Sequence, residues 1–282
     1  MTEAVIESLH DSIRLIPFLL VTYLAVGFIE HAGGARAQKA ISSAGKVGPL
    51  WGGLLGVIPQ CGFSAAASYF YVGKVINLGT LIAVYLSTSD EMLPIFISEH
   101  VPVKTIAAIL TAKAVLGIVS GFAAELIFGW LVRKRHVPKG FEMEPEHHHG
   151  AGSVVREAVV RTFQVFLFIL IISVIIECAI ELVGQDAIAG FFHGTPVLGE
   201  FAAALVGLIP NCAASVVITQ LYTQGIIGAG PMMSGLLASA GVGLLVLFRE
   251  NTHVRQNIAI TVILYAVSVF WGIVIELTGI TF

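Results

Sequence analysis

GVIPQCGFS at residues 56–64 returns as GLIPNCAAS at residues 207–215, so one polar, proline-broken stretch occurs twice in an otherwise apolar chain. The copies are 151 residues apart, the separation of Cys61 and Cys212, and the same offset aligns the flanking sequence without a gap. Matched positions outside the motif include Glu30 with Glu181, Tyr71 with Tyr222, Gly79 with Gly230, Gly121 with Gly272 and Glu125 with Glu276. The sequence therefore predicts two homologous halves.

The composition is that of an integral membrane protein. Of 282 residues, 56% are hydrophobic and 12% charged, and the mean hydropathy is +0.91. Soluble domains are about 45–50% apolar and about 25% charged. The apolar runs are long and continuous, which favours helices over barrel strands. The net charge of −3 argues against nucleic acid as a partner, and the three cysteines do not form a disulfide framework.

The apolar runs predict membrane crossings of about 20 residues each, separated by two elements that carry the motif. The predicted crossings are Ser12–Phe28, Leu78–Ile97, Thr105–Val132, Phe163–Val183, Ile226–Phe248 and Asn257–Ile280. The motif elements are Leu50–Gly73 and Phe201–Gln224, with about ten apolar residues on each side of Pro-x-Cys. No cleavable signal peptide is expected, because the first residues are acidic.

The motif elements are either single broken spans or re-entrant hairpins, and the basic residues decide between them. Hairpins place Lys74 and Arg249 on the same side as the cluster Arg133–Arg135, while the opposite loops 98–102, 184–196 and 224–230 lack Lys and Arg. Basic residues accumulate in cytoplasmic loops, so hairpins are favoured, with the linker cytoplasmic and both termini external.

The resulting fold is an all-α integral membrane protein of two inverted-topology repeats, each with three transmembrane helices and one re-entrant hairpin with a Pro-x-Cys tip. Residues 1–131 form the first repeat, 132–155 a cytoplasmic His/Glu-rich linker and 156–282 the second repeat. Three crossings and one hairpin make an odd count, so the second half runs through the membrane inverted. The two tips are then expected to meet near the midplane.

The motif supplies groups that coordinate ions. Proline leaves nearby backbone carbonyls without hydrogen-bond donors, which at membrane depth requires protein, water or an ion as a partner. Amide, thiol and hydroxyl groups follow, and they make the two tips a predicted binding site. The predicted ligands are Gln60, Cys61 and Ser64 in the first tip and Asn211, Cys212 and Ser215 in the second. The alternative is a pair of tight packing turns built from small residues.

A polar break inside the predicted span Leu78–Ile97 adds negative charge to this site. It contains Ser87, Ser89, Asp90 and Glu91, whereas the matched stretch of the second half, LASAGVG at 237–243, is uncharged. A carboxylate within a span is costly unless it is paired or functional. An ion pair between Lys113 and one of the two acids is the structural alternative, since the residues lie at similar depths.

Other titratable groups have weaker assignments. Glu125 lies deep in its helix and is predicted to take part in proton coupling, whereas Glu30, Glu181 and Glu276 lie near helix ends and are expected to face headgroups. The linker residues His147, His148 and His149 are a predicted accessory metal site, with a solvated flexible connector as the alternative.

Several kinds of catalytic machinery are missing from the sequence. It has no Gly-x4-Gly-Lys-Ser/Thr phosphate loop, no His-Glu-x2-His and no Gly-x-Ser-x-Gly. We therefore expect neither ATP-driven transport nor an enzyme, and no cofactor.

The duplicated Pro-x-Cys hairpins, the Ser-Thr-Ser-Asp-Glu break and the His-rich linker resemble the heavy-metal exporter permeases, a family whose members are described variously as arsenic efflux or manganese transport proteins. The resemblance covers nearly the whole chain and implies metal export. It also implies ten spans, which agrees with six crossings only if each hairpin is counted as two.

The sequence is best explained by a secondary transporter in the cytoplasmic membrane that exports a divalent metal ion such as manganese through a midplane site. Arsenite would require the thiols, whereas manganese would use carboxylates, amides and carbonyls. The alternative is a transporter of a small organic anion, bound at the half-helix N-termini near Ser64 and Ser215. Lipid surrounds the protein, and both a monomer and a homodimer are compatible with the sequence.

Overall fold

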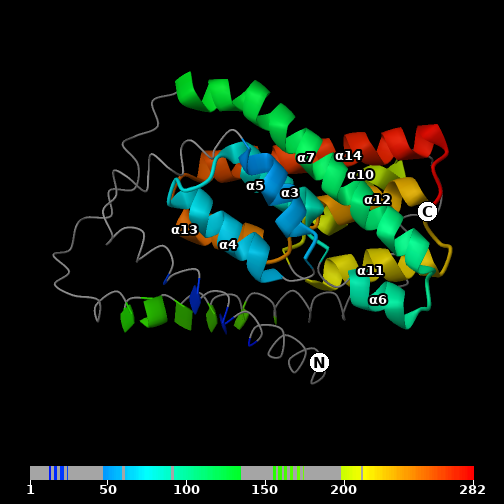
Figure 1. Ribbon diagram of the computed structural model, residues 1–282, viewed down its shortest axis with the longest axis horizontal. Helices are drawn as coiled ribbons and strands as arrows, with labels where there is room; N and C mark the ends of the chain where they lie inside the picture. The colour runs from blue at the N-terminus through cyan, green and yellow to red at the C-terminus, as the bar shows by residue number, and fades with distance from the viewer. Residues whose placement is uncertain are drawn as a thin grey trace.

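The computed structural model describes residues 47–58, 61–89, 92–134, 198–210 and 212–282, together with isolated positions of 13–24 and 155–174. Regular structure in these ranges is helical throughout (Figure 1). The helices of the first half are α3 (Gly48–Gly56), α4 (Cys61–Val72), α5 (Leu78–Ser87), α6 (Met92–Ser98) and α7 (Val103–Lys134). Those of the second half are α10 (Leu198–Gly207), α11 (Cys212–Thr223), α12 (Ala229–Ala238), α13 (Gly243–Glu250) and α14 (Val254–Thr278).

Some predicted site residues lie outside the described residues. They are Gln60, Asp90, Glu91, Asn211, the histidines of the linker, and the side chains of Cys61 and Cys212.

The helices of the two halves correspond at the offset found in the sequence. When 151 is added to the residue numbers, the bounds of α4 and α5 become those of α11 and α12. The first residue of α7 likewise becomes the first residue of α14. The packing corresponds as well: α5 packs on α7 as α12 packs on α14. Helix α4 packs along α13, and α11 packs along α6, so a motif helix of each half lies against the other half.

Local sequence explains where the helices begin and end. Helix α5 begins after Asn77, whose side-chain oxygen accepts hydrogen bonds from the backbone N–H of Thr80 at 2.8 Å and from its hydroxyl at 2.6 Å. Helix α14 ends at Gly279, which adopts the left-handed conformation (φ 66°) that glycine accepts without strain. The predicted polar break separates α5 from α6, and a matched break at residues 239–242 separates α12 from α13.

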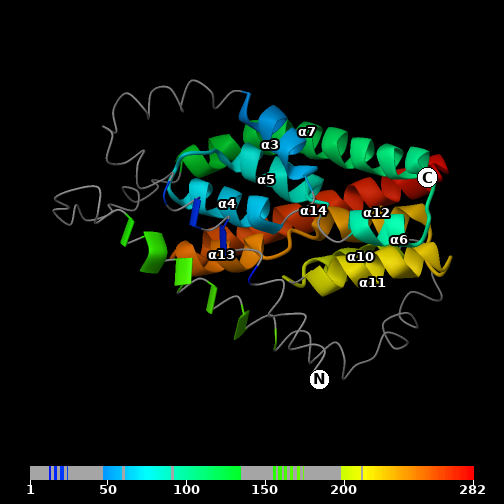
Figure 2. The same cartoon turned by 60° about the horizontal axis from the view of Figure 1, so that its bottom comes forward.

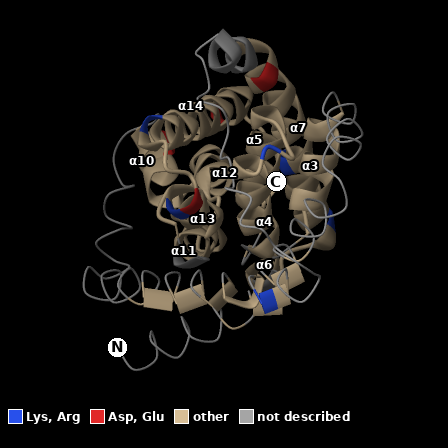
Figure 3. Ribbon diagram, turned by 90° about the vertical axis from the view of Figure 1, so that its left-hand side faces the viewer, with Lys and Arg blue, Asp and Glu red and all other residues tan. Residues whose placement is uncertain are grey.

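Among the residues that the structure describes, three apolar segments are long enough to cross a membrane, and they differ in burial. These segments are Val103–Ile127, Ala229–Glu250 and Val254–Thr278. The middle one, α12 with α13, is 89% buried, whereas the outer two are 39% and 33% buried. Large apolar side chains such as Val115, Phe122 and Phe270 are exposed on the outer helices, and charged residues are few on the described helices (Figure 3). This is the surface of a protein surrounded by lipid.

The two long outer helices run in opposite directions. In Figures 1 and 2, α7 starts beside α6 at the right and finishes at the left, while α14 starts at the left and finishes at the C-terminus on the right. The loop from α4 to α5 also lies at the left-hand end. We call this end the linker end, because residues 132–155 begin where α7 finishes. Helices α4 and α13 extend toward the linker end, and α6 and α11 toward the opposite end.

Candidate functional site

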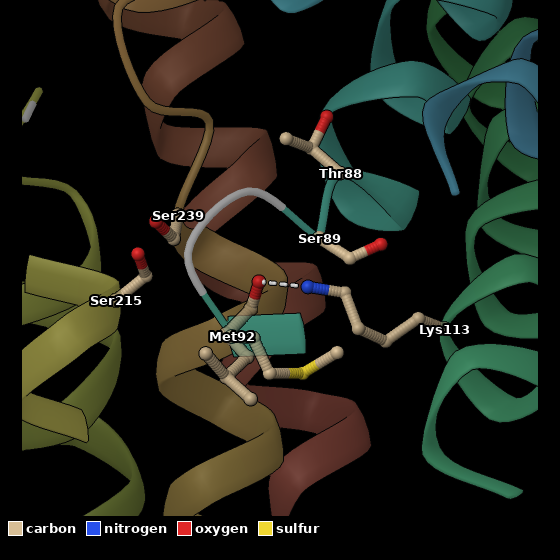
Figure 4. A pocket seen from close by; sticks show the side chains of 7 residues that line it. Thr88, Ser89, Met92, Lys113, Ser215 and Ser239 are labelled. Atoms are coloured by element: carbon tan, nitrogen blue, oxygen red, sulfur yellow. Dashed lines mark hydrogen bonds between the residues drawn. The ribbon is translucent and has the colours of Figure 1, made fainter. Parts of the chain in front are cut away.

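A closed pocket lies where the two halves meet (Figure 4). Its walls are Thr88, Ser89, Met92 and Lys113 from the first half and Ser215, Leu236 and Ser239 from the second. As the side chains lie, no part of it is wide enough for a water molecule. A ligand can therefore occupy this space only if the walls move apart.

Two of the predicted site residues come together in this pocket. Ser89 follows α5 of the first half and Ser215 lies in the first turn of α11 of the second, and both are buried. Thr88 and Ser239 were not predicted, although they occupy matched positions at the two helix breaks. The signal for them was present in the sequence, because the offset of 151 residues aligns one hydroxyl with the other.

Other predicted residues lie apart from the pocket. The Ser87 hydroxyl donates to the backbone oxygen of Ala83 at 2.7 Å, and its side chain lies directly against Gly56 of α3. Ser64 is fully buried in α4, with its backbone against Gly243. The structure thus gives Ser87 and Ser64 packing positions, and a ligand role for either stays a prediction.

The hydroxyl groups of the first half point their protons away from the pocket. Thr88 Oγ1 donates to Val84 O at 2.7 Å, and Ser89 Oγ donates to Val57 O at 3.0 Å. A hydroxyl whose proton is bound by a carbonyl keeps only lone pairs for a second partner. Both groups therefore favour a cation or a hydrogen-bond donor. Ser215 and Ser239 lie near each other on the wall opposite Lys113 (Figure 4).

Lys113 brings a positive charge into the pocket wall. Its side chain is 1% exposed, and Nζ donates to Leu236 O of α12 at 2.7 Å (Figure 4). A buried ammonium is stable only with hydrogen-bond partners, and this bond also joins α7 to the second half. The predicted ion pair of Lys113 with Asp90 or Glu91 falls on residues outside those described.

Three of the positions that match pocket residues at the offset of 151 residues are joined by hydrogen bonds and close backbone contact. The hydroxyls of Ser68 and Tyr85 lie 2.7 Å apart, and both approach the backbone oxygen of Gly243, at 2.7 and 3.2 Å. A Cβ atom on Gly243 would lie 2.8 Å from Ser64 Cβ, so the backbones of α4 and α13 are in close contact. We call Ser64, Ser68, Tyr85 and Gly243 the linker-side contact.

Three of the pocket residues occupy positions that match residues of the linker-side contact in the other half. At the offset of 151 residues, Ser64 corresponds to Ser215, Gly243 to Met92, and Tyr85 to Leu236, all of which line the pocket. The two sides are therefore built from equivalent positions with different side chains. In this structure polar bonds join the halves at the linker-side contact, and the pocket lies at the matched positions.

Two matched carboxylates support the starts of α5 and α12. Glu125 Oε2 accepts the backbone N–H of Gly79 at 3.0 Å, and Glu276 Oε2 accepts that of Gly230 at 3.3 Å. A carboxylate near a helix N-terminus satisfies a donor left unpaired by the helix and interacts favourably with the helix dipole. Glu276 is exposed near its helix end, as expected, and also has this second contact. Glu125 has the same structural contact beside its predicted role in proton coupling.

The described side chains contain no group of three His, Cys, Asp or Glu residues that could hold a metal ion. The predicted charged and thiol ligands lie outside those side chains. What the described part of the pocket offers is hydroxyl oxygens, the ammonium of Lys113 and the thioether of Met92.

Residues 1–193 match a family model described as "Putative, 10TM heavy-metal exporter". The matched segment contains the first half, the linker and the beginning of the second half. No curated protein and no solved structure matches the chain.

Proposed function

The chain belongs to this family of heavy-metal exporters, and on that premise we propose that it is a secondary-active transporter that exports a divalent metal ion such as manganese. It acts as a multi-pass protein of the cytoplasmic membrane, without enzymatic activity, with the linker in the cytoplasm. The substrate site is the pocket between Ser89 and Ser215, extended by the predicted ligands Gln60, Asp90, Glu91 and Asn211.

The observation that carries this proposal is the position of the pocket at two matched helix breaks. Thr88 at the first break and Ser239 at the second line the same pocket. The opposite directions of α7 and α14 and the exchanged packing of α4 on α13 and α11 on α6 support an inverted repeat. Broken helices that meet at the centre of an inverted repeat are the usual binding site of secondary transporters.

Access would alternate by separation of two helix pairs, α4 with α13 and α11 with α6, each of which contains one helix from each half. When α4 and α13 separate, the linker-side contact breaks and the pocket opens toward the cytoplasm. When α11 and α6 separate, the pocket opens to the outside. The structure corresponds to the closed state between these two. In this proposal the motif elements are re-entrant, so that each half has one movable hairpin.

The pocket chemistry favours a hard divalent cation among the ions of this family. Hydroxyl oxygens whose protons are donated to backbone carbonyl oxygens are ligands for manganese, as are amides and carboxylates. Arsenite requires thiolates. The first test is the growth of cells with and without the gene on a panel of metal and metalloid salts. Resistance to manganese alone supports the proposal, and resistance to no ion would refute it. Replacing Cys61 and Cys212 with serine then spares manganese export and abolishes arsenite export.

A second candidate, a transporter of a small organic anion, is favoured by one observation, the buried ammonium of Lys113 in the pocket wall. A carboxylate ligand would bind this ammonium directly. The two candidates respond differently to Lys113→Gln, because removing a positive charge weakens anion binding and strengthens cation binding. Affinity for each ligand class, measured on the purified variant against the native protein, separates them.

A further inference from the structure

Glu200 is a buried carboxyl group away from the pocket. It lies in the first turn of α10 with 1% of its surface exposed. Its Oε2 atom is the one buried side-chain nitrogen or oxygen in the described part of the chain that has no hydrogen-bond partner. The carboxyl group does interact with the backbone amide of its own residue. Neither the sequence motifs nor the pocket explains this group.

The helices packed around Glu200 bring no cation to it. Helix α10 packs on α12, α14 and α11. Helix α12 has no titratable side chain, and α11 has Cys212 at its first residue and Tyr222, whose hydroxyl donates to Phe282 O. Helix α14 has Tyr265, which donates to Phe201 O, and Glu276, whose negative charge opposes a second one on Glu200.

The basic residues of the neighbouring helices lie elsewhere. Arg255 is at the opposite end of α14. Lys113 binds Leu236 O, whereas the Glu200 backbone is bonded to Ser234. Residues two apart on a helix face different ways, so Lys113 and Glu200 approach different faces of α12.

An ionised carboxylate in this place would be unstable. Burial of a charged carboxylate with one oxygen unpartnered and no cation on the helices packed around it costs several kcal/mol, and a neighbouring negative charge adds to the cost. A neutral carboxylic acid avoids both penalties. We propose that Glu200 carries a proton in the closed state and is the group that exchanges it during the transport cycle, an inference that rests on the proposed function.

The contact with α12 links this proton site to the substrate pocket. Ser234 Oγ of α12 donates to the backbone oxygen of Glu200 at 2.8 Å, and the same helix ends at the pocket residues Leu236 and Ser239. Movement of α12 relative to α10 would change the surroundings of the carboxyl group and admit water. A hydrated carboxyl releases its proton readily, and a buried one retains it. Opening of the pocket and proton release are thereby coupled.

The site is present in one half only. The position of Glu200 corresponds to Pro49 in the first half, which has no titratable group. The matched position of the first half therefore cannot hold a proton, and Glu200 lies on the helix that enters from the end opposite the linker. For an exporter, this is the side from which an inward proton gradient would load it.

The first test uses infrared absorption of the purified protein at neutral pH, in the absence of metal. Protonated and ionised carboxyl groups absorb at different frequencies, so a neutral Glu200 predicts a protonated-carboxyl band that disappears in Glu200→Gln. The same band must persist in Glu125→Gln and Glu276→Gln, the matched controls whose carboxylates hold backbone N–H groups. An unchanged band in Glu200→Gln would overturn the inference.

Folding of the variant is itself informative. Removal of an unpartnered neutral group should leave the melting temperature of Glu200→Gln close to that of the native protein, and Glu200→Leu should be tolerated as well. Failure of both variants to fold would show that Glu200 is ionised and paired, against the inference.

The second test measures transport of Mn²⁺ in proteoliposomes. The expected result for Glu200→Gln is Mn²⁺ exchange at equal pH with no stimulation by a pH gradient, while Glu125→Gln and the native protein are stimulated. Stimulation that is lost in Glu125→Gln and retained in Glu200→Gln would contradict the inference and favour Glu125. Absence of Mn²⁺ movement by the native protein would count against the proposed substrate instead, and the infrared result would still decide on the proton.

Discussion

Replacement of Gly243 by alanine should open the site toward the linker end. A Cβ atom at this position would lie 2.8 Å from Ser64 Cβ and 2.9 Å from its backbone carbon and oxygen. Non-bonded carbon atoms are stable at about 3.5 Å or more, so α4 and α13 must separate by about 0.7 Å. Such overpacking costs about 1–3 kcal/mol. Because the clash exists only while the linker-side contact is closed, this cost shifts the opening equilibrium by about 5- to 150-fold.

The helix-forming preference of alanine does not cancel this effect. Alanine favours a helix over glycine by up to about 1 kcal/mol, but α13 is helical in the closed and the open state alike. That gain changes the free energy of unfolding and leaves the opening equilibrium unaltered.

The assay is the rate at which a thiol reagent modifies Val246→Cys in a background whose native cysteines are replaced by serine. Val246 is fully buried in α13, in one cluster with Ala65 and Tyr69 of α4, so separation of these helices should increase its modification. With Gly243→Ala the rate should rise by the factor given above. Gly73→Ala at the end of α4 is the matched control, because the nearest atom to its new Cβ is at an ordinary 3.4 Å. An unchanged rate with Gly243→Ala, or an equal rise with Gly73→Ala, would refute the reasoning.

Further substitutions test other parts of the structure. Tyr85→Phe removes the hydroxyl that is hydrogen-bonded to Ser68. Because each buried hydrogen bond contributes about 1 kcal/mol, the free energy of unfolding measured in a thermal melt should fall by about 1–2 kcal/mol. An unchanged melting curve would show that the bond is not formed. Asn77→Ala removes the cap of α5 and should cost about 1 kcal/mol, with Asn77→Asp retaining most of the stability. Glu125→Gln should leave the pH dependence of transport unaltered, because its carboxylate holds the backbone N–H of Gly79 and Glu200 exchanges the proton; loss of the pH dependence in this variant would instead support the coupling role predicted for Glu125 from the sequence.

The sequence predicted the helix pairs and their interruptions because these depend on local chemistry. Proline at residues 59 and 210 and the polar residues at 87–91 cannot continue an apolar helix, and the offset of 151 residues then transfers each boundary from one half to the other. The break between α5 and α6 occurs where the sequence placed it, whereas the break between α12 and α13 interrupts a segment predicted as one crossing, at the matched residues.

The linker-side contact could not be predicted in the same way. The bonds of Ser68 and Tyr85 to Gly243 join residues more than 150 positions apart, and each side chain alone resembles an ordinary buried hydroxyl. The bond of Lys113 to Leu236 likewise involves a backbone oxygen, which has no signature in the sequence.

Glu200 was missed for a different reason. An acidic residue in the first turn of a helix is common, because it interacts favourably with the helix dipole, and nothing in the local sequence shows that it is buried. The burial of Glu200 becomes visible in the structure, where α10 packs against α12 and α14.

The most direct measurement of the central claim is the location of bound substrate. Crystals grown with Mn²⁺ and measured at the manganese absorption edge should show anomalous density within coordination distance of both Ser89 and Ser215. Density elsewhere in the molecule, or none at a Mn²⁺ concentration that the protein transports, would contradict a substrate site at the meeting of the two halves.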